Sequence, residues 1–328
     1  MAPFRVGETT NPVLAPGRVR SWLERLRTPR YRVQVDYPPV VRPDPPVVRP
    51  DTPHTAPASH PQHGASVAEG KDLYTLTVYK VGQCEMPGPF VFRSSGPDEW
   101  HTLFFYLVVI RGHGKTLVIN TGLPEDLDPL NEVRTGMAGP RCAVTRESDE
   151  RTLAVLARIK LDPATVDYVL VSPFKAYLLA NLHLFSRATV CVSRHGWSEH
   201  YLARRYPSPT PDPLAIPNDV LDRLDRGTPN PLRLLKDNDE ILPGLRTFWV
   251  GTHDPSSMAF VVSTAKGDVV ISDCCLKYDH IEQMQPSGAA NSLESCMNAY
   301  MRIRHAGQIL LPLYDPAVLD RFKDGRIA

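Results

Sequence analysis

Reactive side chains stand just after several predicted strands of this sequence. Histidine and carboxylate groups are common metal ligands, whereas lysine and tyrosine can transfer protons when their pKa values are shifted. In α/β proteins, chemistry is usually found where strands end at the carboxyl edge of a sheet. The side chains in question are Lys175, Tyr177, His253, Asp273 and Tyr314.

The segment 166–185 is the one around which the other segments are arranged. Residues 166–171 are mostly β-branched and aliphatic and stop at Ser172-Pro173, a pattern typical of a strand buried on both faces. Residues 177–184 then predict a short helix. A buried strand that ends abruptly before a helix indicates that its terminal loop lies at the carboxyl edge of a sheet.

Apolar runs predict the remaining elements of a mixed α/β domain. Gly82 is expected to end the first strand, Ser148 to cap a helix, and Gly307 to follow the last helix as its C-terminal glycine. The predicted strands are 73–81, 103–110, 116–119, 189–192, 241–250 (with a turn), 259–263, 268–271 and 308–312, and the predicted helices are 149–159, 195–204, 216–226 and 291–306.

The motifs at these strand ends resemble those of the metallo-β-lactamase superfamily, especially its N-acyl-homoserine-lactonase-like branch. There, a strand ends in Thr-His-x-His-x-Asp-His and continues as Ala-Gly-Asn-Leu-x-Leu-Phe. Here Ser172 replaces the threonine, and 180–185 keeps most of the continuation. Asn120-Thr121-Gly122 stands where the family has Asp-Thr-Gly. The resemblance covers about 73–328 and implies an α/β (α+β) fold, a four-layer αββα sandwich.

The resemblance also implies that most of the family's metal ligands have been replaced. The family binds two metal ions, usually zinc, and of its ligand positions only His253 and Asp273 keep a ligand. Proline and leucine have no donor side chain, and a lysine ammonium repels a cation. We therefore expect no cofactor, or one weakly bound zinc or other divalent ion at His253 and Asp273. The replaced positions hold Pro173, Lys175, Tyr177, Leu178 and Tyr314.

Without metal, the charge of Asp273 needs another partner. Lys175 stands at a lost ligand position, and we expect its ammonium within about 4 Å of the Asp273 carboxylate, with Tyr177 or Tyr314 donating a hydrogen bond. A lysine of lowered pKa beside these two tyrosines would alternatively form a metal-free acid/base site.

Two further groups have simple interpretations. His195 and Glu199 are four residues apart on a predicted helix, where a solvated pair is expected. Cys274-Cys275 is expected to be a pair of packed thiols.

Residues 1–70 differ in composition from residues 71–328, which we expect to form the metallo-β-lactamase-like domain. The first 70 residues contain 13 of the 33 prolines and repeat the unit Pro-Pro-Val-Val-Arg-Pro-Asp. This composition predicts an extended, partly disordered basic arm, with a possible helix at 19–26, that either tethers the domain or docks on a partner protein.

Composition excludes several classes of partner. A net charge of +1 gives no indication of nucleic acid, and no apolar run is long enough to cross a membrane. Six scattered cysteines without CxxC spacing indicate reduced thiols in the cytoplasm.

Two classes of function follow from this sequence. The first is a non-catalytic subunit, paired with an active paralogue of the same fold or with itself, or a binder of a small ligand in the old cleft. The second is a hydrolase of a lactone, ester or amide that uses one metal ion or the Lys175, Tyr177 and Tyr314 side chains.

Overall fold

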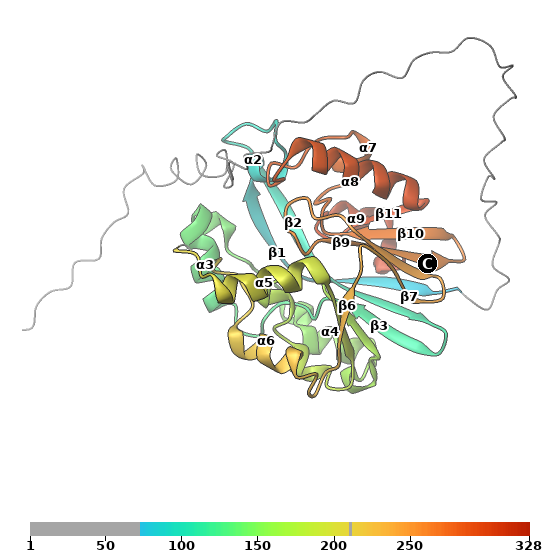
Figure 1. Ribbon diagram of the computed structural model, residues 1–328. Coiled ribbons are helices and arrows are strands. Elements are labelled where there is room, and N and C mark those ends of the chain that lie inside the picture. The colour runs from blue at the N-terminus through green and yellow to red at the C-terminus, as the bar shows by residue number, and fades with distance from the viewer. Residues whose placement is uncertain (1–72, 210–211) are drawn as a thin grey trace, which may run out of the picture. The chain divides into compact units, whose positions relative to one another are not determined.

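Two packed β-sheets form the centre of the molecule, with helices on their outer faces (Figure 1). The computed structural model describes residues 73–209 and 212–328. The inner faces of both sheets contribute fully buried side chains such as Leu107, Ile119 and Phe260 to one hydrophobic core. The predicted four-layer αββα sandwich is therefore confirmed.

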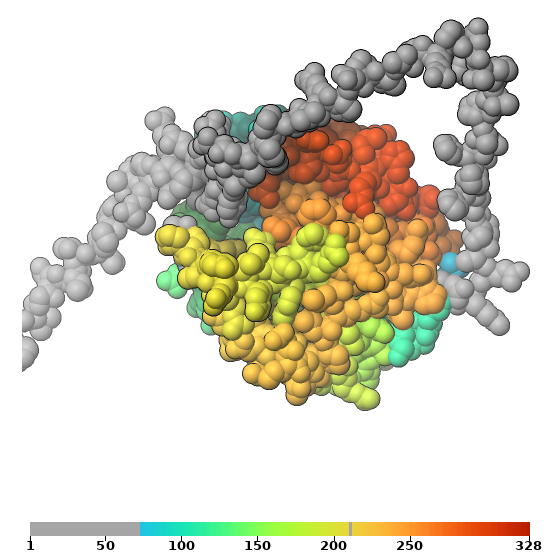
Figure 2. Space-filling view, viewed as in Figure 1, coloured from blue at the N-terminus to red at the C-terminus, as the bar shows by residue number. Residues whose placement is uncertain are grey.

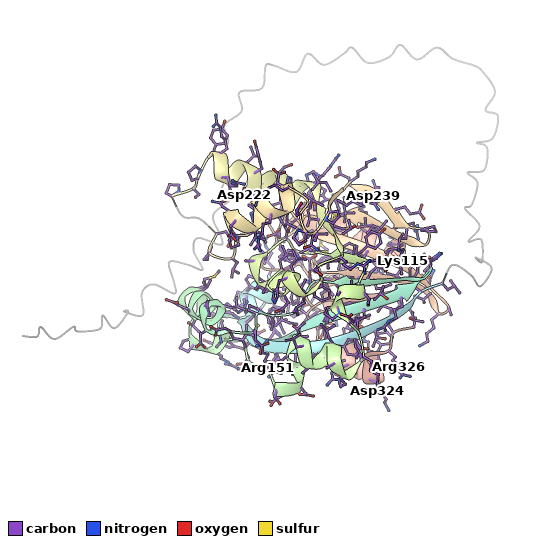
Figure 3. All side chains as sticks on the ribbon, turned by 90° about the horizontal axis from the view of Figure 1, so that it is seen from below. Lys115, Arg151, Asp222, Asp239, Asp324 and Arg326 are labelled. Atoms are coloured by element: carbon purple, nitrogen blue, oxygen red, sulfur yellow. The ribbon has the colours of Figure 1, made fainter. Side chains whose placement is uncertain are left out.

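The first sheet has the strand order β1-β2-β3-β4-β5-β6. Strands β3 to β6 run parallel to one another, so their carboxyl ends share one edge of the sheet. A long antiparallel hairpin of β1 and β2 adjoins them, and Figure 3 shows Lys115 at the tip of the next hairpin. The strands are β1 (Thr75–Pro87), β2 (Trp100–Gly112), β3 (Lys115–Ile119), β4 (Tyr168–Leu170), β5 (Thr189–Ser193) and β6 (Leu232–Leu235).

The second sheet has the order β11-β10-β9-β8-β7. Strand β11 runs parallel to β10, whereas the other neighbours are antiparallel. Asp273 and Tyr314 therefore follow the ends of two adjacent parallel strands. The strands are β7 (Asn238–Leu242), β8 (Leu245–Trp249), β9 (Met258–Thr264), β10 (Gly267–Ser272) and β11 (Ile309–Pro312).

The helices cover the sheets with their apolar faces. Cys296, Ala299, Tyr300 and Ile303 of α8 pack on the outer face of the second sheet, and α4 and α6 bury leucine and valine side chains at the first. The helices are α2 (Gly88–Val91), α3 (Asp128–Ala138), α4 (Thr152–Arg158), α5 (Arg194–Arg205), α6 (Asn218–Asp225), α7 (Asp279–Glu282), α8 (Leu293–Ala306) and α9 (Ala317–Arg321).

The prediction of a helix at 177–184 is wrong. Two short 3-10 turns, Ala176–Leu178 and Leu182–Leu184, stand in its place. The backbone NH and the hydroxyl of Thr121 both donate to the Leu178 carbonyl, and the Asn181 side chain donates to the carbonyls of Thr121 and Leu123. Thr121, in the segment after β3, thus occupies the Leu178 carbonyl, which would accept a backbone hydrogen bond in a continuous helix.

Three predicted element ends are also wrong. Gly82 does not end β1 but lies in a bulge, after which the strand continues. Ser148 does not cap the following helix, because a 3-10 turn capped by Glu147 comes first. Gly307 has extended backbone rather than the left-handed conformation of a C-terminal glycine.

The predictions for 1–70, including the helix at 19–26, lie outside the described residues. Within the described residues, no helix is long and apolar enough to cross a membrane.

Candidate functional site

The predicted site residues lie at the facing ends of the two sheets. The loop after β4 contributes Lys175 and Tyr177, and the segment between β8 and β9 contributes His253. Asp273 follows β10, and its charge acts on the phenols of both Tyr177 and Tyr314. The strand ends therefore bring these five side chains into one region.

Asp273 is fully buried and is held by two hydroxyl groups. Ser172 Oγ donates to its Oδ1, and Ser257 Oγ donates to its Oδ2 at 2.5 Å. His253 Nε2 lies 3.6 Å from Oδ2. Burial raises the pKa of Asp273 above its ordinary value, although His253 and both serines act in the opposite direction.

Lys175 does not pair with Asp273, so the predicted ion pair is wrong. Its Nζ lies 2.7 Å from Oδ2 of Asp254 and 2.6 Å from Oδ2 of Asp212. Asp273 already has its two serine donors, whereas Asp254 is buried and next to His253. A buried carboxylate requires a counter-charge, and Lys175 supplies it there.

The same ion pairs determine the protonation of Lys175. Burial alone would lower the pKa of Lys175, but the carboxylates of Asp254 and Asp212 outweigh it and raise that pKa. Lys175 in turn lowers the pKa of Asp254 below its ordinary value, against the effect of burial. The lysine is therefore held as an ammonium ion, which is the wrong form for a general base.

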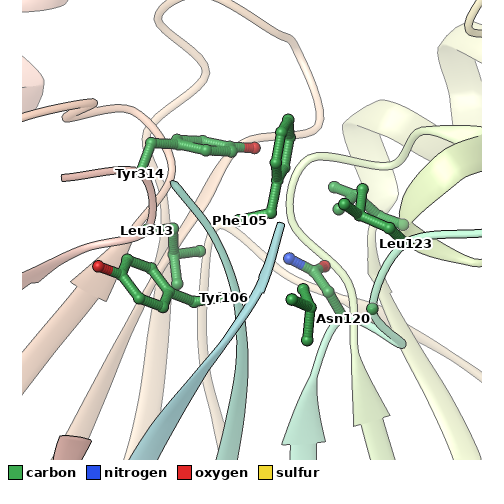
Figure 4. Close-up of a pocket in the computed structure, with 9 residues that line it drawn as sticks. Phe105, Tyr106, Asn120, Leu123, Leu313 and Tyr314 are labelled. Atoms are coloured by element: carbon green, nitrogen blue, oxygen red, sulfur yellow. The ribbon is translucent and has the colours of Figure 1, made fainter. Parts of the chain in front are cut away.

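The rings of Tyr177 and Tyr314 lie together, Tyr314 buried and Tyr177 half-buried. Both rings meet Phe105 edge to face, with centroids 6.0 and 5.8 Å away, and Figure 4 shows Tyr314 beside Phe105. The two phenols are hydrogen-bonded to each other, and burial raises the pKa of each. A hydroxyl in this environment stays protonated at neutral pH.

The cavity beside these rings is small. It is bordered by Phe105, Asn120, Leu178 and Tyr314 among others (Figure 4), and its volume is about 10 Å³. A space of this size accommodates about one water molecule, far less than the few hundred cubic ångströms of a ligand pocket.

The residues present do not fit a pair of metal ions. Both oxygens of Asp273 accept serine hydrogen bonds, and Pro173 and Leu178 offer no donor atom. In residues 73–209 and 212–328, no group of three or more His, Cys, Asp or Glu side chains is arranged to hold a metal. His253 Nδ1 is buried without a hydrogen-bond partner among the described residues and is therefore a free ligand atom at this site.

Asn120 has a structural role that sequence reasoning missed. Its Nδ2 donates to the Ser172 carbonyl and its Oδ1 accepts from the Ser172 NH, both at 3.1 Å. An aspartate could accept from the NH but could not donate to the carbonyl. Asparagine thus positions the loop after β4 by a reciprocal pair of hydrogen bonds.

Asp254, Asp212 and Ser257 were also missed. The run Asp254-Pro-Ser-Ser257, directly after His253, was the available signal, because aspartate followed by serines forms local hydrogen bonds. Ser256 NH and Oγ both donate to Asp254 Oδ1.

The two minor groups have ordinary environments. His195 Nε2 contacts Asp237 at 2.6 Å, and its ring stacks on Trp249, so it is not paired with Glu199. Cys274 and Cys275 are buried free thiols, as expected.

Comparison with solved structures shows what this architecture resembles. An N-acyl homoserine lactone hydrolase has a TM-score of 0.62 and 14% identity, covering 76% of this chain and 96% of its own. A probable metal-dependent hydrolase from Staphylococcus aureus has a TM-score of 0.54 and 17% identity, covering 70% and 83%.

A hydrolase of the beta lactamase superfamily, AbOPH, has a TM-score of 0.53 and 12% identity, covering 78% and 89%. No family model and no curated protein matches the sequence. On the basis of this structural similarity and its two-sheet architecture, the chain has the metallo-β-lactamase fold.

Proposed function

We propose that this chain is a non-catalytic protein of the metallo-β-lactamase fold. The observation that carries the proposal is that side chains of the protein satisfy one another where relatives hold metal. Asp273 is bound by two serines, and Lys175 is bound by Asp254 and Asp212. A metal ion would have to break these bonds and would gain few ligands in return.

Among non-catalytic roles, a protein-binding subunit is better supported than a binder of a small ligand in the cavity beside Tyr314. The cavity beside Tyr314 has a volume of about 10 Å³, and a drug-sized ligand needs at least about 300 Å³. The free thiols fit a protein that works in the reducing cytoplasm.

One observation favours the second candidate, a hydrolase with a single metal ion. His253 Nδ1 has no partner among the described residues, and Asp273 lies beside the same ring. A metal-free reaction at Lys175 is less well supported, because its pKa is raised rather than lowered.

Metal content and lactone hydrolysis test the proposal. The full chain, purified after exposure to excess zinc, is analysed by mass spectrometry for metal and assayed with N-acyl homoserine lactones. We expect well under one zinc per chain and no hydrolysis above buffer. The variant His253→Ala is the control, and it should not change either value.

Near-stoichiometric zinc with hydrolysis, both lost in His253→Ala, would contradict the proposal and establish the single-metal hydrolase. A matched gain-of-ligand variant carries P173H, K175H, Y177D, L178H and Y314H. If it binds zinc where the natural chain does not, the replaced positions account for the loss.

A further inference from the structure

A groove lies between the last elements of the chain, and none of the five predicted site residues lines it. Its volume is about 480 Å³, which is within the range of small-ligand pockets and far above that of the cavity beside Tyr314. Helices α7, α8 and α9 and strand β11 border the groove and lie together in Figure 1. Helix α8, coloured red, reaches the surface of the molecule in Figure 2.

The lining of this groove is largely apolar. Ile281 of α7, Ile303 of α8 and Val270 of β10 are buried and belong to the core beneath the groove. Ile309 of β11 and Phe322 after α9 are half-buried and pack on the core from either side. Contact with these side chains removes apolar area from water, so the groove favours a ligand with a hydrocarbon body.

Arg321 also lines the groove, but its charge is already neutralised. Its guanidinium donates two hydrogen bonds to the carboxylate of Glu282 in α7, of which the one from Nη2 to Oε2 measures 2.9 Å. Its Cζ lies 3.5 Å from the centroid of the Tyr278 ring. The guanidinium is therefore fixed between α9 and α7, and an anionic ligand would have to displace Glu282 to use it.

Arg304 supplies the charge of the groove that has no counterpart. It stands in the last turn of α8 and is exposed. Its side chain has no hydrogen bond, ion pair or ring contact with another described residue. Because two arginines and one glutamate line the groove, the lining has a net charge of +1. The planar guanidinium of Arg304 offers a fork of NH donors that matches the two oxygens of a carboxylate.

Gln308 adds neutral donors on the same side, where α8 leads into β11. Its NH donates to the Asp268 carbonyl at 2.9 Å, and its Oε1 accepts from the Asp268 NH at 2.7 Å. These two bonds hold the side chain in place, and its amide NH2 group has no hydrogen bond with another described residue. Arg304 and Gln308, the exposed side chains of the groove with unused polar groups, therefore both offer donors.

We propose that this groove binds an aliphatic carboxylate of medium chain length, such as decanoate. The carboxylate would accept hydrogen bonds from Arg304 and Gln308, and the alkyl chain would lie along Ile309 and Phe322. A ligand with one negative charge balances the net charge of the lining, whereas a second negative charge would meet Glu282. This inference does not depend on whether the chain is catalytic, because the groove shares no residue with the strand-end site.

Titration calorimetry of the full chain tests the class of ligand. We expect decanoate to bind at one site with a dissociation constant on the order of 100 μM, as its small size allows. Acetate lacks the alkyl chain, and decyltrimethylammonium has the same chain with the opposite charge, so each should bind at least about tenfold more weakly. The proposal is overturned if decanoate shows no binding at about 1 mM, or if the cation binds as tightly as decanoate.

Two variants test the position of the site. Gln308→Glu keeps an acceptor for the Asp268 NH but replaces the amide donors by a charge that repels the ligand, and Arg304→Met removes the positive charge. We expect each to weaken decanoate binding by about tenfold or more. Arg226→Met at the end of α6 is the matched control, because it removes another exposed arginine outside the groove and should not change the affinity. Melting temperatures of the free variants verify folding, and equal affinity of all four proteins for decanoate overturns the proposed site.

Discussion

Asp273 and Asp254 show two ways of burying a carboxylate at the strand ends. Asp273 is surrounded by hydroxyl donors and has a raised pKa, so its charge is only partly compensated. Asp254 has a full counter-charge in Lys175 and a lowered pKa. Lys175 is therefore important for stability, because removing it leaves the buried carboxylate of Asp254 without a counter-charge.

Replacing Lys175 should destabilise the protein through Asp254. Lys175→Met keeps most of the stem and removes the ammonium, and we expect a loss of about 2–4 kcal/mol in the free energy of unfolding. Asp212 is 43% exposed on its side chain, so Asp212→Ala should cost at most about 1 kcal/mol. Urea unfolding at pH 7 measures both.

The double variant Lys175→Met with Asp254→Asn completes the comparison. It should recover much of the loss, because no buried charge is then left unpaired and Asp212 is partly exposed. If Lys175→Met costs no more than Asp212→Ala, the ion pair with Asp254 contributes little and this account is wrong.

That Pro173 and Leu178 have no ligating side chain follows from residue type alone, but the partners of Lys175 and Asp273 do not. The partner of Lys175 depends instead on which nearby carboxylate keeps an oxygen without a donor: serines bind both oxygens of Asp273, whereas Ser256 binds only Oδ1 of Asp254. That is determined by Ser172 and Ser257, which approach Asp273 from segments far apart in the chain.

The elements were predicted well where a buried apolar run determined them. Strands β3, β9 and β11 follow runs of aliphatic residues that are buried on both faces or on one. The segment 176–184 has equally apolar residues, but long-range hydrogen bonds from Thr121 interrupt it. Local periodicity contains no information about such bonds.

A histidine connects three elements around the second sheet. Nδ1 of His280 in α7 is hydrogen-bonded to the Tyr300 hydroxyl of α8 at 2.6 Å, and the His280 ring stacks on Phe92 after α2. The Tyr300 hydroxyl also accepts from the Ser287 NH at 3.2 Å. The imidazole is buried in this contact, where its neutral form is favoured over the charged one.

Acid should weaken this connection. Burial, with the charges of His253, Lys277 and His101, lowers the pKa of His280 to about 3. The unfolded chain, with a histidine pKa of about 6.5, binds the proton first. Stability is therefore fully present above pH 6.5 and is lost as the pH falls towards 3. At pH 5 the loss is about 2 kcal/mol.

The variant His280→Asn isolates this effect, because its oxygen can accept from Tyr300 but does not titrate. The natural chain should be the more stable at pH 7.5, and its advantage should shrink by about 2 kcal/mol at pH 5. Unfolding curves at several pH values measure the difference. An advantage that is constant over this range would show that His280 is not the titrating group.

At the scale of the whole molecule, the first and last parts of the described residues are hydrogen-bonded to each other. The Leu76 NH donates to the carbonyl of Ala328 at 2.9 Å, and the Ile327 NH donates to the carbonyl of Leu76. Leu76, Val78 and Ile327 are fully buried in the core. Ile327 and Ala328 therefore pair with the beginning of strand β1.

This closure leads to a prediction for the proline-rich residues 1–70. Their 13 prolines remove backbone donors. The core of the described residues is built from side chains between Tyr74 and Ile327. A chain beginning at residue 71 should unfold cooperatively, with a melting temperature within about 2 °C of the full chain, a shift that corresponds to less than about 1 kcal/mol. A chain beginning at residue 79 is the control: it lacks Leu76 and Val78 and should melt far lower or without cooperativity. Calorimetry of the three proteins tests this prediction. If the chain from residue 71 melts like the control, the first 70 residues belong to the folded core.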